Sequence, residues 1–178
     1  MPKEEYARVL DFLPQGHPLD RKRIPLAQVI GENRFTLLEV VPRGDVKLTP
    51  GERVYIGEGK RDKISFIKDK IEFDRLTGTA KAELESVIKR MVKDKEKEII
   101  ELFNQAGPIT TRYHSLELLP GVGKKHMWKI IDEREIEPFK SFKDLQERVK
   151  LLPDPVRMVT KAILKELEGE SKYKLFTE

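Results

Sequence analysis

The chain has 178 residues, which suits one domain or two small ones, and it contains no cysteine, which excludes a disulfide framework and a thiolate metal site. Charged residues make up 37% of the chain, well above the usual share of about 25%, yet the net charge is only +4. Abundant lysine and glutamate with few amide residues predict a thermophilic source. No apolar run resembles a signal peptide or could span a membrane, so we expect a cytoplasmic protein.

The first part of the chain, residues 1–73, is predicted to form a small β-barrel. Short apolar or alternating runs are separated by turn signals such as Pro42-Arg43-Gly44. The expected strands lie within residues 5–13, 25–31, 34–41, 52–57 and 63–73. Five strands in so short a segment are compatible with an OB-like barrel, a fold that binds oligonucleotides through one face and two loops. A purely structural β module is the alternative.

Two basic loops fall where an OB-like barrel would use them to meet phosphates. The first contains Arg21, Lys22 and Arg23, and the second contains Lys60 and Arg61. A charged run can also be no more than a solvated loop. The second loop includes Gly-Glu-Gly-Lys, but the spacing of a nucleotide-hydrolysing phosphate loop is absent, so nucleotide hydrolysis is not expected.

Aromatic residues of this segment are candidates for stacking on bases, because aromatic rings bind unpaired bases with little regard to sequence. The candidates are Tyr6, Phe35, Tyr55 and Phe66. Aromatic residues at alternating strand positions are more often part of a core, and that alternative stays open here.

Residues 74–107 are predicted to form a helical connector. Thr79 and Asp94 are candidate N-caps for two successive helices. The first helix carries an apolar stripe at helical spacing, made of Leu84, Val87, Ile88, Met91 and Val92. The segment has no net charge and no catalytic cluster, so we expect a scaffold or, alternatively, a surface for a partner protein.

The most informative stretch is Leu118-Leu119-Pro120-Gly121-Val122-Gly123-Lys124-Lys125, which leads into a basic amphipathic helix. A short helix over residues 116–119, capped by Ser115, is expected before it. Glycine adopts a positive φ at little cost and so permits a sharp turn between two helices. Backbone amides at the start of the second helix favour an anion, and the paired lysines add positive charge at the same point.

This stretch resembles the helix-hairpin-helix motif, which grips phosphate in many DNA- and RNA-handling proteins. The predicted phosphate-binding residues are Gly121, Gly123, Lys124 and Lys125, with Val122 pointing inward as the anchor of the turn. A helix–turn–helix corner without a ligand is the alternative.

A degenerate copy of the pattern follows at Leu151-Leu152-Pro153-Asp154-Pro155-Val156-Arg157. The Leu-Leu-Pro sequence repeats and Arg157 takes the place of Lys124, but Asp154 and Val156 replace the glycines. We therefore expect this copy to complete the fold and to grip phosphate poorly. Tandem helix-hairpin-helix domains often pair a competent and a degenerate hairpin in this way, and the joining helix is expected over residues 141–150.

Catalytic interpretations fit the sequence poorly. His17, His114 and His126 lie far apart and lack a metal-ligand spacing, and no carboxylate cluster is recognisable. A glycosylase built on this hairpin would also need a catalytic lysine or aspartate and a base pocket. We therefore predict a protein that is not an enzyme and that holds no metal and no cofactor.

Over nearly its whole length the chain resembles a small archaeal family of unknown function, domain of unknown function six-five-five. The resemblance implies nucleic-acid binding, with RNA in a translation or ribosome-assembly setting as the expected ligand. The predicted class is α+β, with an OB-like β-barrel over residues 1–73, a helical connector over 74–107 and an all-α tandem helix-hairpin-helix domain over 108–178. The predicted function is largely sequence-independent binding of RNA or DNA backbone. The alternative is a protein–protein interaction module or the binding subunit of a larger complex.

Overall fold

The computed structural model describes residues 3–177, which form a mixed α+β protein. The chain divides into two compact units. The first ends at Val87 and also includes the C-terminal residues from Phe176, and the second covers Ile88–Leu175. Within the described part of the chain, no helix is long and apolar enough to cross a membrane.

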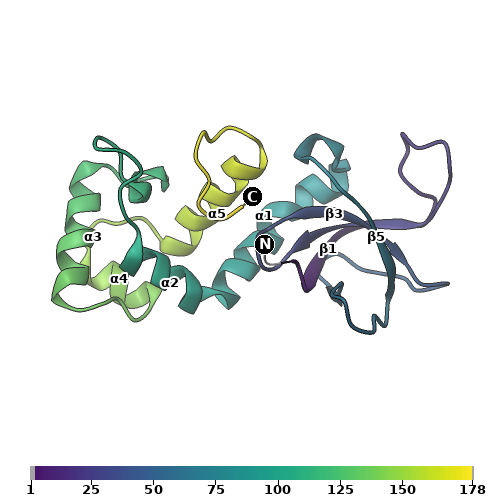
Figure 1. Cartoon of the computed structure of the whole chain (residues 1–178), viewed down its shortest axis with the longest axis horizontal. Helices are drawn as coiled ribbons and strands as arrows, with labels where there is room; N and C mark the ends of the chain where they lie inside the picture. Colours follow the sequence, from purple (N-terminus) through teal and green to yellow (C-terminus); the bar gives the residue numbers. More distant parts are fainter. Residues whose placement is uncertain (1–2, 178) are drawn as a thin grey trace. The chain divides into compact units, whose positions relative to one another are not determined.

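The first unit is built on a five-stranded antiparallel sheet that curls into a half-barrel (Figure 1). The strands are β1 (Tyr6–Leu13), β2 (Leu26–Gly31), β3 (Leu37–Pro42), β4 (Arg53–Tyr55) and β5 (Ile64–Lys70). Their spatial order is β4-β1-β2-β3-β5, so β4 and β5 form the two edges of the sheet. Register shifts interrupt the pairing of β1 with β2 and of β3 with β5, and such irregularities bend the strands.

Alternation along the strands divides the side chains between a concave and a convex face. The concave face carries most of the core of the half-barrel, to which Leu48 and Ile56 add from outside the strands. The core comprises Ala7, Val9, Ala27, Val29, Leu38, Val40, Leu48, Val54, Ile56 and Ile64. The strands overlap the expected ranges, but β3 begins three residues later, at Leu37, β4 covers only Arg53–Tyr55, and β5 ends at Lys70, before Phe73 begins a 3-10 helix. Phe35 has a φ of 55° and belongs to the preceding turn, which a propensity pattern alone does not reveal.

A polar network on the convex face fixes the loop between β1 and β2. The carboxylate of Glu39, only 1% exposed, accepts hydrogen bonds from Gln28 Nε2 at 3.0 Å and from Arg75 Nε and Nη2 at 3.1 Å. Arg75 Nη2 also donates to both carboxylate oxygens of Asp20 at 3.0 Å, and Lys68 Nζ donates to Asp20 at 3.0 Å. Hydrogen bonds from Lys68 and Arg75 lower the pKa of Asp20. Two cations thus hold the residue that precedes the first basic loop.

The start of the first long helix is attached to the same face. Helix α1 (Gly78–Asp94) follows a short 3-10 helix, η1 (Phe73–Arg75). Thr77, not Thr79, caps α1, because Thr77 Oγ1 accepts the N–H of Ala80 at 3.1 Å. The same hydroxyl donates to Asp11 at 2.6 Å, so a tertiary contact selects this threonine over the one expected from the sequence.

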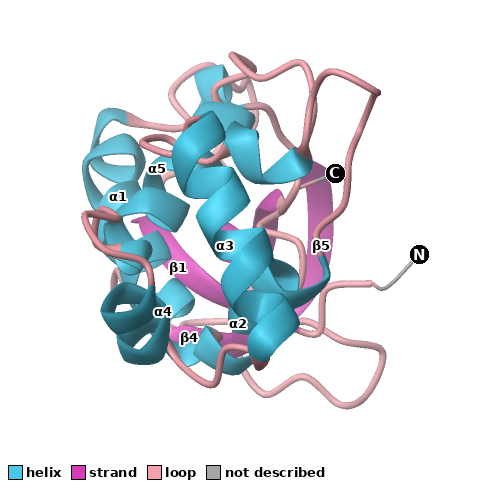
Figure 2. Cartoon of the chain, turned by 90° about the vertical axis from the view of Figure 1, so that its left-hand side faces the viewer, coloured by secondary structure: helices cyan, strands magenta, loops and turns pink. Residues whose placement is uncertain are grey.

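The second unit contains the end of α1 and four further helices, shown in cyan in Figure 2. These are α2 (Glu96–Gln105), α3 (Lys124–Ile136), α4 (Phe142–Arg148) and α5 (Pro155–Leu167), with a 3-10 helix, η2 (Ser115–Leu118), before α3. The N-cap of α2 is Lys95, one residue after the expected Asp94, which still belongs to α1. Helix α4 lies inside the range expected for the joining helix, and the Ser141 hydroxyl caps it by accepting the N–H of Asp144 at 3.0 Å.

Two polar side chains fasten the loop between α3 and α4. The side-chain amide of Asn104 donates to the carbonyl of Phe139 at 3.0 Å and accepts its N–H at 2.7 Å. The Arg148 guanidinium donates to the carbonyl oxygens of Glu133 and Glu137 and lies 4.5 Å from the Phe139 ring centroid. A cation in this position satisfies the last carbonyls of α3 and favours the negative end of its dipole.

Candidate nucleic-acid interface

The predicted phosphate-binding residues lie together at the beginning of α3, after a tight turn that we call the glycine turn (residues 119–123). The turn is closed by a hydrogen bond from Val122 N to the Leu119 carbonyl at 3.0 Å. Gly121 has a φ of 91°, a left-handed conformation that favours glycine. The Val122 side chain is buried, as expected for an anchor.

The two glycines of the turn differ in what the fold requires of them. A Cβ on Gly121 would lie 2.7 Å from Cγ of Pro153, so glycine is needed there for space as well as for its positive φ. Gly123 has a φ of −94°, which any residue adopts, and no heavy atom lies within 4 Å of a Cβ placed on it. Neither backbone strain nor crowding within the described chain therefore explains a glycine at position 123.

The N-terminus of α3 also differs from that of α5. Gly123 is the N-cap of α3 and offers its backbone amides no side-chain acceptor. In α5 the N-cap is Asp154, whose carboxylate accepts the N–H of Val156 at 3.1 Å. Helix α5 thus supplies its own anion. The first turn of α3 receives no such side-chain cap, and a helix N-terminus favours negative charge.

The two lysines of the turn have different environments. Lys124 Nζ lies 3.1 Å from Oε2 of Glu117 and donates to the Arg112 carbonyl at 2.9 Å. Lys125 is exposed, and among residues 3–177 it has no hydrogen-bond or ion-pair partner. His126 Nδ1 lies 3.2 Å from the Gly121 carbonyl oxygen. The sequence pattern did not distinguish the two lysines. In the structure, Lys124 is hydrogen-bonded beside the turn, whereas Lys125 is available to a ligand.

A capping box stabilises the approach to the glycine turn. The N-cap of η2 is His114, not the expected Ser115, whose hydroxyl instead donates to the Gly107 carbonyl at 2.7 Å. His114 Nδ1 accepts the N–H of Leu116 at 3.0 Å, and the Glu117 carboxylate accepts the N–H of His114 at 2.8 Å. This hydrogen bond from His114 lowers the pKa of Glu117. Burial, with a further contribution from the charge of Arg134, lowers the pKa of His114.

The lowered pKa of His114 predicts a pH-dependent stability of the second unit. Protonation would remove the Nδ1 acceptor, so the folded state binds this proton less readily than the unfolded chain. The free energy of unfolding is therefore expected to fall as the pH drops below about 6.5, by at most about 1.4 kcal/mol per pH unit. Urea titrations followed by Trp128 fluorescence at several pH values measure this change in the free energy of unfolding. His114→Asn keeps a capping acceptor and should show a flatter profile, whereas equal slopes would contradict the assignment.

Trp128 lies one turn into α3 and is 58% exposed, which is unusual for the largest apolar side chain. It follows Lys125 by three positions, so the two side chains share a face of the helix. An exposed aromatic ring beside an available cation provides a surface on which a base can stack. The sequence pattern did not indicate that Trp128 belongs to the candidate site.

The other basic site candidates lie on two loops of the first unit. Arg21, Lys22 and Arg23 are exposed in the loop between β1 and β2. Lys60 and Arg61 lie in the loop between β4 and β5, where Arg61 Nε donates to the Gly57 carbonyl at 2.7 Å. The structure therefore distributes the predicted residues over three separate segments, of which the glycine turn is one.

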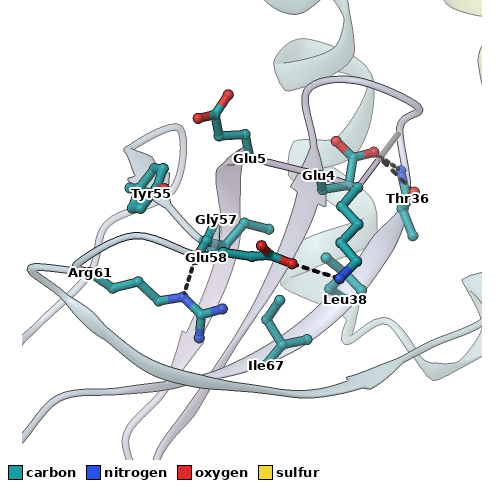
Figure 3. Close-up of a pocket in the computed structure, with 11 residues that line it drawn as sticks. Glu4, Glu5, Thr36, Leu38, Tyr55, Gly57, Glu58, Arg61 and Ile67 are labelled. Carbon is teal, nitrogen blue, oxygen red and sulfur yellow. Dashed lines mark hydrogen bonds and ion pairs between the residues drawn. The ribbon is translucent and has the colours of Figure 1, made fainter. Parts of the chain in front are cut away.

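A pocket of about 860 Å³ opens in the first unit, and we call it the barrel pocket (Figure 3). Its apolar lining comes from Leu38, Ile56 and Ile67, and Tyr55 and Arg61 stand beside them. Four aromatic residues had been candidates for stacking, but Phe35 is buried. Tyr6 and Tyr55 pack edge to face with their ring centroids 5.3 Å apart, and Phe66 on β5 is 49% exposed.

Glu4 lines the barrel pocket but serves the fold. Its carboxylate accepts the backbone N–H of Asn33 at 2.6 Å and of Arg34 at 2.7 Å, and the hydroxyl of Thr36 at 3.0 Å. A Cβ on Gly31 would lie only 2.1 Å from the Glu4 side chain, so that glycine makes room for it. Glu4 therefore holds the turn before β3 and has few acceptor positions left for a ligand.

Comparison with known proteins places the chain among uncharacterised relatives. Residues 3–178 match the family described as "Protein of unknown function (DUF655)". The uncharacterized protein MJ0038 of Methanocaldococcus jannaschii is 49% identical over 173 residues, which cover 97% of this chain and 78% of that protein. The crystal structure of Af1531 from Archaeoglobus fulgidus is similar with a TM-score of 0.88 and 49% identity, over 98% of this chain and 100% of that one.

Proposed function

Since the chain belongs to this family of unknown function, with relatives in archaea, we propose from the geometry of the glycine turn that the protein binds nucleic acid without catalysis. The proposed contact is largely independent of sequence. Backbone N–H groups at the start of α3 donate hydrogen bonds to a phosphate of RNA or DNA, and Lys125 adds a charge-assisted contact. Such contacts position a protein on the polymer without reading its bases.

The observation that carries this proposal is the presence of glycine at position 123, where the fold does not require it. Its backbone is extended and its surroundings are open, so the fold would accept a side chain there. A side chain would nevertheless block close approach of a ligand to the amides of Lys124 and Lys125. Approach of a phosphodiester gives a physical reason for glycine at this position, as it does in the helix-hairpin-helix motif.

The first unit supports the same proposal at a coarser level. The strand order β4-β1-β2-β3-β5, with β1, β2 and β3 as consecutive antiparallel neighbours, is compatible with a partly open OB-like barrel. Its two basic loops join β1 to β2 and β4 to β5, which are the loops that OB-like barrels use for oligonucleotides. We infer that this unit contributes a second contact to the same polymer.

The test compares Lys125→Gln with Lys161→Gln, a matched control on α5 that removes an equal charge from an exposed side chain. Anisotropy of labelled single-stranded RNA, single-stranded DNA and duplex DNA is measured at several salt concentrations. Wild type is expected to bind with a clear salt dependence. Lys125→Gln should weaken binding by about tenfold, the effect of losing roughly 1.4 kcal/mol from a charge-assisted hydrogen bond. It should also lower the log–log salt slope by about one unit.

Two outcomes would overturn the proposal. One is an absence of binding to all three nucleic acids at low salt. The other is a Lys125→Gln variant that binds as well as the Lys161→Gln control. Either result would favour the alternative, a protein–protein interaction module.

A further inference from the structure

We propose that the barrel pocket binds one nucleotide of a single-stranded nucleic acid, with the base on its apolar lining and the phosphate on Arg61. The ligand class rests on the proposed function, while the site itself lies wholly in the first unit. The volume of about 860 Å³ falls within the range of small-molecule sites, about 300–1,000 Å³, and a single nucleotide is a ligand of that class.

The apolar part of the lining suits the flat, weakly polar body of a base, while Glu4, Glu5 and Glu58 contribute carboxylates to the same pocket. Leu38 on β3 and Ile56, which directly follows β4, belong to the buried core and line the pocket with apolar side chains. Ile67 on β5 is 37% exposed, so its apolar surface is open to a ligand. These residues present few polar groups to the edge of a base. We therefore expect affinity without strong discrimination among bases.

Tyr55 gives the pocket a fixed aromatic wall. Its hydroxyl accepts the N–H of Gly59 at 2.9 Å, and its ring packs edge to face against Tyr6. Bases form favourable stacks on such rings. Because the ring is already held in place, little side-chain entropy would be lost on binding.

Arg61 supplies the anion-binding group. Its Nε donates to the Gly57 carbonyl at 2.7 Å, which orients the guanidinium, and the group points toward Ile67 in Figure 3. Among residues 3–177, Nη1 and Nη2 of Arg61 have no hydrogen-bond partner, and this pair matches the oxygens of a phosphate. Lys3 and Glu58 also line the pocket, where Lys3 Nζ and Glu58 Oε1 form an exposed ion pair at 2.7 Å, which screening weakens and a ligand can displace.

A second, smaller pocket favours a nucleic-acid polymer over a free mononucleotide as the ligand. It measures about 470 Å³, shares Tyr55 with the barrel pocket and is lined by the cations Arg53, Lys60 and Lys63. Lys63 pairs with Glu52, whereas Lys60 has no partner among the described residues. A strand that placed one base in the barrel pocket could lay a neighbouring phosphate beside Lys60. A free metabolite would leave this second pocket unused.

The test uses the full chain with isoleucine methyl groups labelled for NMR. Adenosine and uridine monophosphates are titrated to 10 mM, with adenosine and inorganic phosphate as separate probes. Both nucleotides are expected to shift the methyl signals of Ile56 and Ile67, whereas phosphate alone leaves them in place. Arg61→Gln should raise the Kd about tenfold, while Lys47→Gln, an equal charge change at an exposed lysine of the same unit, should not.

A further variant distinguishes the barrel pocket from the glycine turn. Lys125→Gln should leave the mononucleotide titration unchanged even where it weakens binding of the polymer. The proposal is overturned if 10 mM nucleotide leaves both methyl signals in place, or if phosphate alone reproduces the shifts. It is also overturned if Arg61→Gln binds nucleotide as tightly as wild type.

Discussion

Replacing Arg75 with alanine is expected to lower the free energy of unfolding of the first unit by about 3–5 kcal/mol. The guanidinium makes two hydrogen bonds to Glu39 and two to Asp20. Without it, the buried carboxylate of Glu39 keeps only the hydrogen bond from Gln28 and the ion pair with Lys68, whose Nζ lies 4.0 Å from Glu39 Oε1. A buried carboxylate that loses its main partner bears its desolvation cost uncompensated.

Urea unfolding followed by circular dichroism measures this loss, and hydrogen exchange of the β2 amides assigns it to the first unit. Arg21→Ala, a change to an exposed arginine of the nearby loop, should stay within about 0.5 kcal/mol of wild type. Adding Glu39→Gln to Arg75→Ala should recover stability, because it removes the buried charge. If the double variant is less stable than Arg75→Ala, the cost has another origin, such as lost packing of the arginine stem.

The sequence contains an indication of the polar network around Arg75 that the strand predictions did not use. Gln28 and Glu39 each interrupt an apolar strand run at a position where both neighbours are buried. A polar residue in such a run needs a partner, but the partner can come from anywhere in the chain. Here it comes from Arg75, 36 positions after Glu39. The need for a partner was therefore predictable, and its identity was not.

The elements themselves were predictable because their signals are local. Alternation and turn residues located the strands, and apolar spacing located the helices α1, α2 and α4. Errors arose where a tertiary contact decided between adjacent candidates. Thr77 caps α1 because it also reaches Asp11, and His114 caps η2 because Ser115 is used by Gly107. Sequence spacing alone cannot rank such competitors.

In the candidate site, too, local features were predictable and tertiary contacts were not. The position of the glycine turn followed from the sequence, as did the carboxylate at Asp154 that distinguishes the second copy. The different roles of Lys124 and Lys125 did not, since they depend on the geometry of Glu117 across the turn. The barrel pocket was also missed, because its lining comes from segments that meet only in the folded chain.

Gly123→Asp is expected to abolish binding at the glycine turn while leaving the second unit as stable as wild type, or more stable by a few tenths of a kcal/mol. Aspartate is a slightly better N-cap than glycine, and the extended backbone at this position accepts it. Its carboxylate would satisfy the first amides of α3, as Asp154 does in α5. The anion site would then be occupied by the protein itself and would repel a phosphate.

Gly123→Asn is the matched control, because asparagine caps a helix about as well as aspartate and carries no charge. Thermal unfolding followed by Trp128 fluorescence should show both variants folded. Anisotropy with labelled RNA should then show the aspartate variant losing binding by more than about tenfold, and more than the asparagine variant. A stable aspartate variant that binds like wild type would mean that phosphate does not contact these amides. A variant that is as stable as wild type but binds less tightly is the result expected if the open helix end serves a ligand, so this pair of measurements tests whether glycine at position 123 serves binding.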